Sequence, residues 1–254
     1  MNTVQVIAIE GLPLSREGDN IGQLIVNTTK THGIQLQERD IIVVTHVFVS
    51  KAEGNIVNLD TVEPSKRAFE IAKQTNKDPA LVEVILREAK DIVKVGPNSI
   101  ITETKSGTIS ANSGVDRSNV SGERNVVLLP KDPSRSAQNI RIEIKRLTGI
   151  NVAVIVSDTH GRPFRIGEIN VAIGAAGIKP IRDRRGEKDL FGYTLQIKQT
   201  AIADELASAA ELVMGQANEG IPAAIIRGYT VYQSVEDMSS SVKLVRPKEK
   251  DLFR

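Results

Sequence analysis

Hydrophobic residues along the chain recur at two kinds of spacing, which predict a mixture of strands and helices. Runs rich in β-branched and apolar residues predict strands at residues 4–9, 40–50, 152–156, 169–173 and 222–227. Apolar positions three to four residues apart predict amphipathic helices at residues 20–30, 64–74, 79–94, 134–148 and 201–214. Strands and helices do not alternate strictly. The sequence therefore predicts an α+β fold with mixed or antiparallel sheets and packed helices, rather than a doubly wound Rossmann sheet.

Shorter signals fill in the connections. Residues 99–104 and 107–111 flank a Lys-Ser-Gly turn and predict a hairpin, and residues 126–129 and 193–199 predict two further strands. Asp132 or Ser134 is a suitable cap for the helix at 134–148, and Gly149 is a suitable stop. The stretch from Gly174 to Gly177 predicts a tight packing turn. We expect a single domain over residues 1–254, with room for two lobes.

Composition narrows the classes of function. The chain has 33 Lys and Arg against 31 Asp and Glu, no Cys, no Trp and only eight Phe and Tyr. The net charge of +2 and the scarcity of aromatic residues argue against nucleic acid as a partner. Without Cys there is no disulfide, thiolate zinc site or cysteine nucleophile. We find neither a signal-peptide pattern nor a run long enough for a membrane span, and we expect a cytoplasmic protein that does not bind membranes.

Two aspartate segments carry the strongest chemical signal. Asp116 lies in Asn-Ser-Gly-Val-Asp-Arg-Ser-Asn-Val, and Asp158 lies in Ser-Asp-Thr-His-Gly-Arg-Pro; each follows a β-type run. Carboxylate and hydroxyl oxygens are the ligands that hard divalent cations prefer, and guanidinium groups bind phosphate. The pair therefore indicates metal-assisted phosphate chemistry. The alternative is structural, with Asp116 capping a turn and Asp158 capping a helix.

Other polar residues give weaker signals. The chain has no P-loop and no Gly-x-Gly-x-x-Gly after a strand, so any nucleotide must be held by other means. Lys51 follows a predicted buried strand, where its ammonium group would face a ligand; an ordinary turn lysine would have the same spacing. Five arginines are candidates for binding phosphate or carboxylate, although solvation or pairing with nearby acids is the usual fate of such residues: Arg162, Arg165, Arg182, Arg184 and Arg185.

Six segments in order resemble the coenzyme F420-0:L-glutamate ligase family, the γ-glutamyl ligases of deazaflavin biosynthesis. They are Glu-Gly-Leu-Pro-Leu at 10–14, Ser-Lys-Ala-Glu-Gly at 50–54, the Asp116 segment at 112–120, Asp-Thr-His-Gly-Arg at 158–162, Ala-Asp-Glu at 203–205 and Glu-Gly-Ile-Pro at 219–222. The resemblance covers the chain from about Val6 to Gly228. The two aspartate segments are specific as a pair.

The resemblance implies a GTP-dependent ligase that uses Mg²⁺ or Mn²⁺ at two sites, with K⁺ also associated. It would add L-glutamate to coenzyme F420-0 through an acyl phosphate, then add a second glutamate in γ-linkage, with no catalytic nucleophile from the protein. A homodimer is implied as well. By motif match the metal ligands would be Asp116, Asp158, Thr159 and Gln216. Nucleotide-binding positions would be Leu12, Pro13, Leu14, Ser15, His46, Val47, Lys51, Asn119, Leu212, Val213, Met214, Gly215, Gln216, Ala217, Asn218 and Glu219.

At three of these positions the sequence departs from the implied pattern. His46 and Val47 stand where the family often has small hydroxyl residues, and Gln216 is neutral where an acid is expected. Two alternative functions also stay open: an amide ligase acting on another carboxylate, and a nucleotide-binding regulatory module without chemistry.

Overall fold

A mixed six-stranded sheet forms the centre of the molecule. The computed structural model describes residues 3–229, 234–239 and 244–252. The sheet has the order β1 (Gln5–Ala8), β12 (Ala223–Arg227), β2 (Ile41–Thr45), β8 (Ala153–Arg162), β9 (Arg165–Ile178) and β13 (Ser234–Ser239). β2 and β8 run parallel, whereas the other neighbouring strands described in this sheet run antiparallel. The fold is α+β.

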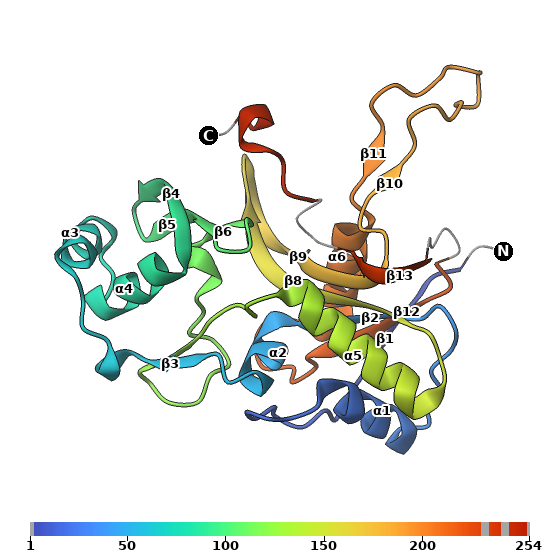
Figure 1. Cartoon of the computed structure of the whole chain (residues 1–254), viewed down its shortest axis with the longest axis horizontal. Helices are drawn as coiled ribbons and strands as arrows, with labels where there is room; N and C mark the ends of the chain where they lie inside the picture. The colour runs from blue at the N-terminus through green and yellow to red at the C-terminus, as the bar shows by residue number, and fades with distance from the viewer. Residues whose placement is uncertain (1–2, 230–233, 240–243, 253–254) are drawn as a thin grey trace.

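Helices cover both faces of this sheet, as Figure 1 shows. Side chains along a strand alternate between faces, so Ile42 and Val44 of β2 pack in one cluster with α1 (Ile21–Thr31) and α5 (Pro133–Thr148). Ile41 and Val43 pack in a second cluster with α6 (Ile202–Met214). All four β2 side chains are fully buried. The sheet therefore has an apolar layer on each side and a stiff backbone between them.

A second unit, which we call the small lobe (residues 56–127), is inserted between β2 and β8. Its elements are β3 (Ile56–Asn58), the 3₁₀ turn Leu59–Thr61, α3 (Lys66–Thr75), α4 (Pro79–Glu88), β4 (Ala89–Gly96), β5 (Ser99–Thr104), β6 (Ile109–Ala111), the 3₁₀ turn Asn112–Gly114 and β7 (Asn125–Val127). It has its own buried cluster, to which Leu59, Ile85 and Ile100 contribute. Pairing of β3 with β7 brings its two ends together.

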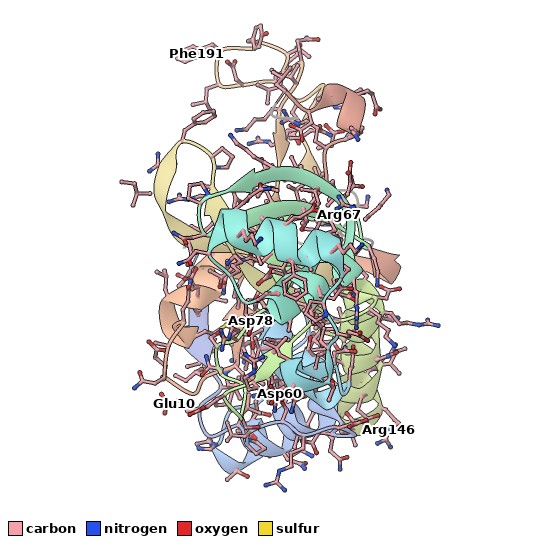
Figure 2. All side chains as sticks on the ribbon, turned by 90° about the vertical axis from the view of Figure 1, so that its left-hand side faces the viewer. Glu10, Asp60, Arg67, Asp78, Arg146 and Phe191 are labelled. Atoms are coloured by element: carbon pink, nitrogen blue, oxygen red, sulfur yellow. The ribbon has the colours of Figure 1, made fainter. Side chains whose placement is uncertain are left out.

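A long arm projects from the central sheet. It comprises residues 182–200, held at its base by β10 (Arg182–Asp183) and β11 (Gln199–Thr200). Leu190 is 98% exposed and Phe191 96% exposed. Figures 1 and 2 show the arm extending away from the helices, with Phe191 at its outer end. We call residues 182–200 the projecting arm. A further 3₁₀ turn, Lys248–Lys250, follows β13.

Two predicted elements are wrong in their second halves. The strand predicted at 40–50 ends at Thr45, and α2 (His46–Ala52) begins at the next residue, because the Thr45 side chain accepts from the Phe48 amide as an N-cap. The helix predicted at 79–94 ends at Glu88, and the chain continues as β4, paired with β5. In both cases tertiary packing outweighs local propensity.

Two further expectations are wrong. The stretch 174–177 is not a turn but lies inside β9, where a Cβ on Gly174 would come within 2.3 Å of the Pro133 carbonyl carbon. Glycine is needed there for the close approach of α5 to the sheet. Of the strand predicted at 193–199, Gln199 pairs as part of β11 and Thr194 forms an isolated bridge with Lys188, but the stretch between them is not a strand. The hairpin at 99–111 and the other main elements are confirmed, including the Asp132 cap and the left-handed Gly149 stop.

No helix among the described residues combines the length and the apolar character needed to cross a bilayer.

Candidate functional site at the ends of β2 and β8

The parallel pairing of β2 with β8 positions the candidate site. β2 and β8 are in register from Ile41 opposite Ala153 to Thr45 opposite Ser157. Their carboxyl ends therefore lie at the same edge of the sheet. α2 starts at His46, directly after β2, while β8 continues through Asp158. This arrangement places residues 46 and 158 side by side although they are distant in sequence.

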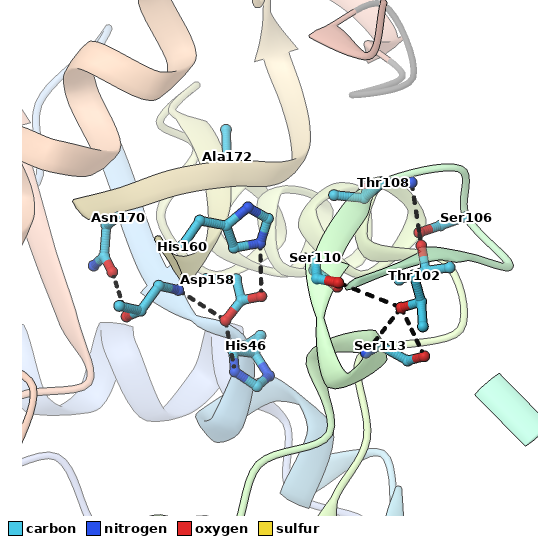
Figure 3. Close-up of polar contacts among 12 residues, drawn as sticks. His46, Thr102, Ser106, Thr108, Ser110, Ser113, Asp158, His160, Asn170 and Ala172 are labelled. Carbon is cyan, nitrogen blue, oxygen red and sulfur yellow. Dashed lines mark hydrogen bonds and ion pairs between the residues drawn. The ribbon is translucent and has the colours of Figure 1, made fainter. Parts of the chain in front are cut away.

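Asp158 is the centre of a buried polar network, drawn in Figure 3. Its Oδ1 lies 3.1 Å from Nε2 of His46 and accepts from the Thr159 amide at 2.8 Å. Its Oδ2 lies 3.0 Å from Nε2 of His160. Only 8% of Asp158 and 5% of His46 are exposed to solvent. Both carboxylate oxygens thus have partners in a region from which water is largely excluded.

The charges in this network support one another. Burial alone would raise the pKa of Asp158, but the charges and hydrogen bonds of His46 and His160 hold it far below its ordinary value. Burial alone would lower the pKa of His46, but Asp158 and the charge of Asp116 raise it above its ordinary value. Nδ1 of His46 is buried without a hydrogen-bond partner. The network therefore favours an ionised Asp158 and leaves one ring nitrogen free.

Asp116 approaches the same imidazole from the small lobe. Its backbone exchanges two hydrogen bonds with Val127, of 3.0 and 2.8 Å, which ties it to β7. Its carboxylate accepts from the amide and the hydroxyl of Ser118, at 2.8 and 2.7 Å. The alternative that Asp116 caps a turn is therefore confirmed as local geometry, whereas Asp158 lies within β8 and caps no helix. The negative charges of Asp116 and Asp158 both raise the pKa of His46, so both aspartates interact with the same imidazole.

The turn before Asp116 is anchored in the small lobe. Ser113 has the left-handed φ of +56°, is buried, and donates from its hydroxyl to the carbonyl of Ile85 at 2.9 Å. Its amide donates to the hydroxyl of Thr102 at 3.0 Å, as Figure 3 also shows. These bonds fix the direction in which the chain leaves β6 and enters the Asp116 segment.

Lys51 connects α2 to this segment. Its ammonium group donates to the backbone carbonyl of Asn119 at 3.3 Å, and partial burial lowers its pKa. Ser15 donates to the carbonyl of Phe48 at 2.8 Å, which holds residues 12–15 against α2. Leu12 and Ser15 are buried and Pro13 and Leu14 exposed, while Val47 is partly buried. Three predicted nucleotide-binding segments thus meet around α2.

The other face of the sheet edge carries a second group of polar residues. Strand alternation directs Thr159 away from Asp158, and its hydroxyl donates to Oδ1 of Asn170 at 2.8 Å. The backbone amide of Asn170 donates to the Glu211 carboxylate at 2.9 Å, and the Ser208 hydroxyl donates to the backbone carbonyl of Asn170 at 2.8 Å. Glu211 is in the last turn of α6, just before Gln216. The predicted metal ligands thus fall into two groups, one on each face.

The segment after α6 differs in exposure from residue to residue. Leu212 is exposed, Val213 and Gly215 are partly buried, and the side chain of Met214 lies in the core under α6. Gln216, Ala217, Asn218 and Glu219 are exposed. Glu219 accepts from the Ala217 amide at 2.8 Å, and this bond lowers its pKa. The Pro222 carbonyl accepts from the Thr45 amide at 2.9 Å, which joins the end of this segment to the end of β2.

The arginines are mostly engaged in local contacts. Arg185 is paired with Asp183 and Arg184 with Glu187, so for these two the expectation of pairing with nearby acids is confirmed. Arg182 lies 3.9 Å from Glu187. Arg162 donates to the Ile166 carbonyl at 3.0 Å, near the tip of the β8–β9 hairpin, and Arg165 is exposed on that hairpin.

Over the described ranges, no three His, Cys, Asp or Glu side chains are grouped so that they would hold a metal by themselves. The oxygen donors nonetheless suit a magnesium-type ion, which usually keeps several waters and binds through one or two carboxylates together with substrate phosphates. Asp116, Asp158 and the Thr159 hydroxyl are donors of this kind.

Sequence reasoning missed part of the network. Asn170 and Glu211 were not singled out, and neither was the role of Asp204, which accepts from the Ala172 amide at 2.9 Å and whose pKa is raised by burial. Asp204, Ser208 and Glu211 are spaced by four and three residues, so they share one face of α6. Three polar residues on one face of the otherwise apolar α6 are the sequence signal that could have indicated this part of the network.

Comparison with known proteins identifies the family. The model of the F420-0:Gamma-glutamyl ligase family matches residues 11–228, which is most of the chain. The chain belongs to the F420-0:gamma-glutamyl ligase family. It is 48% identical over 251 residues to the coenzyme F420:L-glutamate ligase of Methanothermobacter thermautotrophicus, covering 99% of both chains. It is 50% identical over 253 residues to the ligase of that name from Methanocaldococcus jannaschii, covering 99% of this chain and 97% of the relative.

A third relative, the coenzyme F420:L-glutamate ligase of Methanopyrus kandleri, is 46% identical over 258 residues and is matched along its whole length. The resemblance expected from the motifs is therefore confirmed, and the protein is a member of a ligase family. The strand-end site just described lies inside the region that the F420-0:gamma-glutamyl ligase model covers.

Proposed function

We propose that this protein is a GTP- and divalent-metal-dependent ligase that adds L-glutamate to coenzyme F420-0 and then adds a further glutamate in γ-linkage. The near full-length similarity to coenzyme F420:L-glutamate ligases supports the substrates. The observation that carries the proposal is the buried, ionised Asp158 at the strand ends, with Asp116 and Lys51 converging on the same region.

The chemistry explains why a nucleotide is required. A carboxylate is a poor electrophile and does not react with an amine in water. If a carboxylate oxygen attacks the γ-phosphorus of GTP, GDP leaves and an acyl phosphate forms. The uncharged amino group of glutamate then attacks the carbonyl carbon, inorganic phosphate leaves, and the amine nitrogen loses a proton to solvent. One difficult step is replaced by two easier ones, and no nucleophile from the protein is needed.

Donors on both faces of the sheet edge fit bound metal. Asp158 and Asp116 would hold an ion on the α2 face, and Thr159, with Gln216 after α6, would hold one on the other face. Mg²⁺ or Mn²⁺ bound there would offset the negative charge of the triphosphate as it meets a carboxylate. Potassium remains part of the proposal through the family resemblance alone.

The nucleotide would be held without a P-loop. Lys51 would supply a cation beside the Asn119 turn, where its ammonium group is partly buried. The segments at residues 12–15 and 212–219, with His46 and Val47, would complete the GTP site. Most of these contacts would be made by backbone and small polar groups.

A homodimer is also part of the proposal. Exposed apolar side chains gather on the projecting arm, namely Leu190, Phe191, Tyr193 and Ile197, and others lie at the separate tip of the β8–β9 hairpin, namely Phe164 and Ile166. Large apolar side chains held this far into solvent are typical of surfaces that are buried against another chain.

The test is an incubation of the purified protein with coenzyme F420-0, L-glutamate, GTP and Mn²⁺ or Mg²⁺. We expect GDP release together with a mass gain of one and then two glutamate residues. Replacing GTP by ATP, or adding a chelator, is expected to suppress both. GTP binding without GDP release or mass gain would instead favour a regulatory module. Size-exclusion chromatography with light scattering tests the dimer separately.

A further inference from the structure

Asn170 is an unusual residue for its position. It lies in the interior of β9, is only 3% exposed, and stands directly opposite Thr159 in the antiparallel β8–β9 pair. Asparagine is disfavoured in strands, and burying its amide is costly unless it is hydrogen-bonded. The role of this side chain therefore needs an explanation beyond packing.

The contact between the two side chains has a definite direction. Oδ1 of Asn170 is an acceptor only, so the Thr159 hydroxyl donates its single proton to it across 2.8 Å. Once that proton is committed, the lone pairs of the threonine oxygen are all that the hydroxyl offers to a ligand. An oxygen with its lone pairs free and its proton turned away is suited to a hard cation.

The backbone of Asn170 is fixed from α6. Glu211 accepts from its amide at 2.9 Å, and Ser208 donates to its carbonyl at 2.8 Å. In the described part of the chain, β13 pairs with β9 between Ala175 and Ile178. At Asn170, Glu211 and Ser208 bond to the backbone groups on that edge of β9. The amide side chain is therefore held in place before any ligand arrives.

We propose that Asn170 is a positioning residue that orients the Thr159 hydroxyl so that its oxygen is preset to bind a divalent cation. This inference rests on the proposed function, in which Thr159 is a metal ligand. Outer-shell partners of metal ligands act in this way, and their loss typically weakens metal binding about 10- to 100-fold. Glu211 and Ser208 support the arrangement through the backbone of Asn170 and need not touch the ion.

The experiment measures Mn²⁺ binding in the presence of GTP, without glutamate, by electron paramagnetic resonance of free Mn²⁺ and by calorimetry. We expect Asn170→Ala to weaken one class of Mn²⁺ site about 10-fold or more. Asn170→Asp keeps an acceptor oxygen at the same position and is expected to stay within about threefold of the unchanged protein. Thr159→Val should remove the same class of site.

A double variant tests the route of the effect. If Asn170 acts through Thr159, adding Asn170→Ala to Thr159→Val changes Mn²⁺ binding no further, because effects on one coupled unit are not additive. Thr29→Val is the matched control, since it removes a buried hydroxyl bond of 2.9 Å in α1, on the opposite face of the sheet. It is expected to leave Mn²⁺ binding unchanged.

Several results would overturn the inference. These are unchanged Mn²⁺ binding in Asn170→Ala, equal loss in Asn170→Asp, or a full additional loss in the double variant. Should Asn170→Ala not fold, Asn170→Ser gives the same comparison with a polar group too short to reach Thr159. If the unchanged protein binds no Mn²⁺ with GTP, the proposed function fails at its metal dependence, which is a different result from a variant that binds normally.

Discussion

The two aspartates of the site are supported in opposite ways. Asp158 is built into β8 at the centre of the sheet, is buried, and has three donors around its carboxylate. Asp116 lies on a turn of the small lobe, is partly exposed, and is held by Ser118, two residues away. The first depends on packing of the whole sheet, and the second on a local turn. The proposed site would thus combine one buried carboxylate in a strand with one partly exposed carboxylate on a turn.

This difference has a chemical rationale. A carboxylate buried with imidazoles keeps its charge and position whether or not a cation is present. In the proposed function, a carboxylate that is partly exposed and held only by a neighbouring serine could adjust as phosphate oxygens enter and leave.

The largest loss is expected for Asp158→Asn. Removing the charge leaves the buried His46 without its ionic partner, and breaking such a pair costs about 3 kcal/mol. Loss of an outer-shell partner of a metal ligand costs up to about 100-fold in activity. Because Asp158 is proposed as a direct ligand, turnover should fall by more than that. Urea unfolding and the glutamate-addition assay check these two expectations. An unchanged unfolding free energy would show that the network is not part of the fold.

Gly174→Ala comes next. Its Cβ would lie 2.3 Å from the Pro133 carbonyl carbon, so α5 must move off the sheet that carries Asp158. Overpacking of this kind costs about 1–3 kcal/mol. Gly161→Ala in β8 is the control, since nothing lies within 4 Å of its Cβ. If the two variants unfold at the same urea concentration, the sheet is less rigid than we describe.

A smaller effect, dependent on pH, is expected in the small lobe. Burial alone would raise the pKa of Asp78, but hydrogen bonds from Arg124 and from backbone amides, with the charge of Arg124, lower it. A carboxyl group with a lowered folded-state pKa stabilises the protein above its unfolded-state pKa, near 4, and this contribution is lost as the pH falls through the folded-state value.

Asp78→Asn should therefore reduce the unfolding free energy by about 0.5–1 kcal/mol at pH 7, and by less as the pH approaches 3. Urea titrations at several pH values measure the difference between variant and unchanged protein. A difference that grows toward low pH would contradict the assignment. Arg124→Gln should show the same trend, because it removes the partner of the same pair.

The smallest change in stability is expected for Asp116→Asn. The asparagine side-chain oxygen still accepts from Ser118, so the turn persists and the unfolding free energy changes by less than about 0.5 kcal/mol. Turnover should nevertheless fall as severely as in Asp158→Asn. Equal losses of stability in the two variants would break the comparison between a rigid and an adjustable aspartate.

The sequence predicted the elements better than their boundaries. Buried runs such as residues 152–156 and helices with caps, such as the one between Asp132 and Gly149, could be recognised because the spacing of apolar residues and the capping residues agree. The break at Thr45 could not, since Val47 and Val49 favour strands, although both lie in the helix α2 that follows the Thr45 cap. Likewise, residues 89–96 follow α4 without a breaker.

For the proposed site, the sequence points to individual residues but not to how the structure groups them. Asp116, Asp158 and Lys51 follow β-type runs, which is a visible signal. The pairing of His46 with Asp158 depends on the parallel register of β2 and β8, and no local pattern encodes a register between distant strands. The separation of Thr159 from Asp158 follows from strand alternation only once β8 is known to continue through both residues.

The parallel contact of β2 with β8 has a consequence for the order of folding. The bond from the Ser157 hydroxyl to the Val44 carbonyl joins residues 113 positions apart, with the small lobe in the intervening chain. Closing so long a loop is slow, whereas hairpins such as β5–β6 form from neighbouring residues. We therefore expect the small lobe to acquire structure first, and Asp158 to meet His46 only in the last, most cooperative step. A nascent chain released before residue 158 would carry Asp116 and Lys51 but no site.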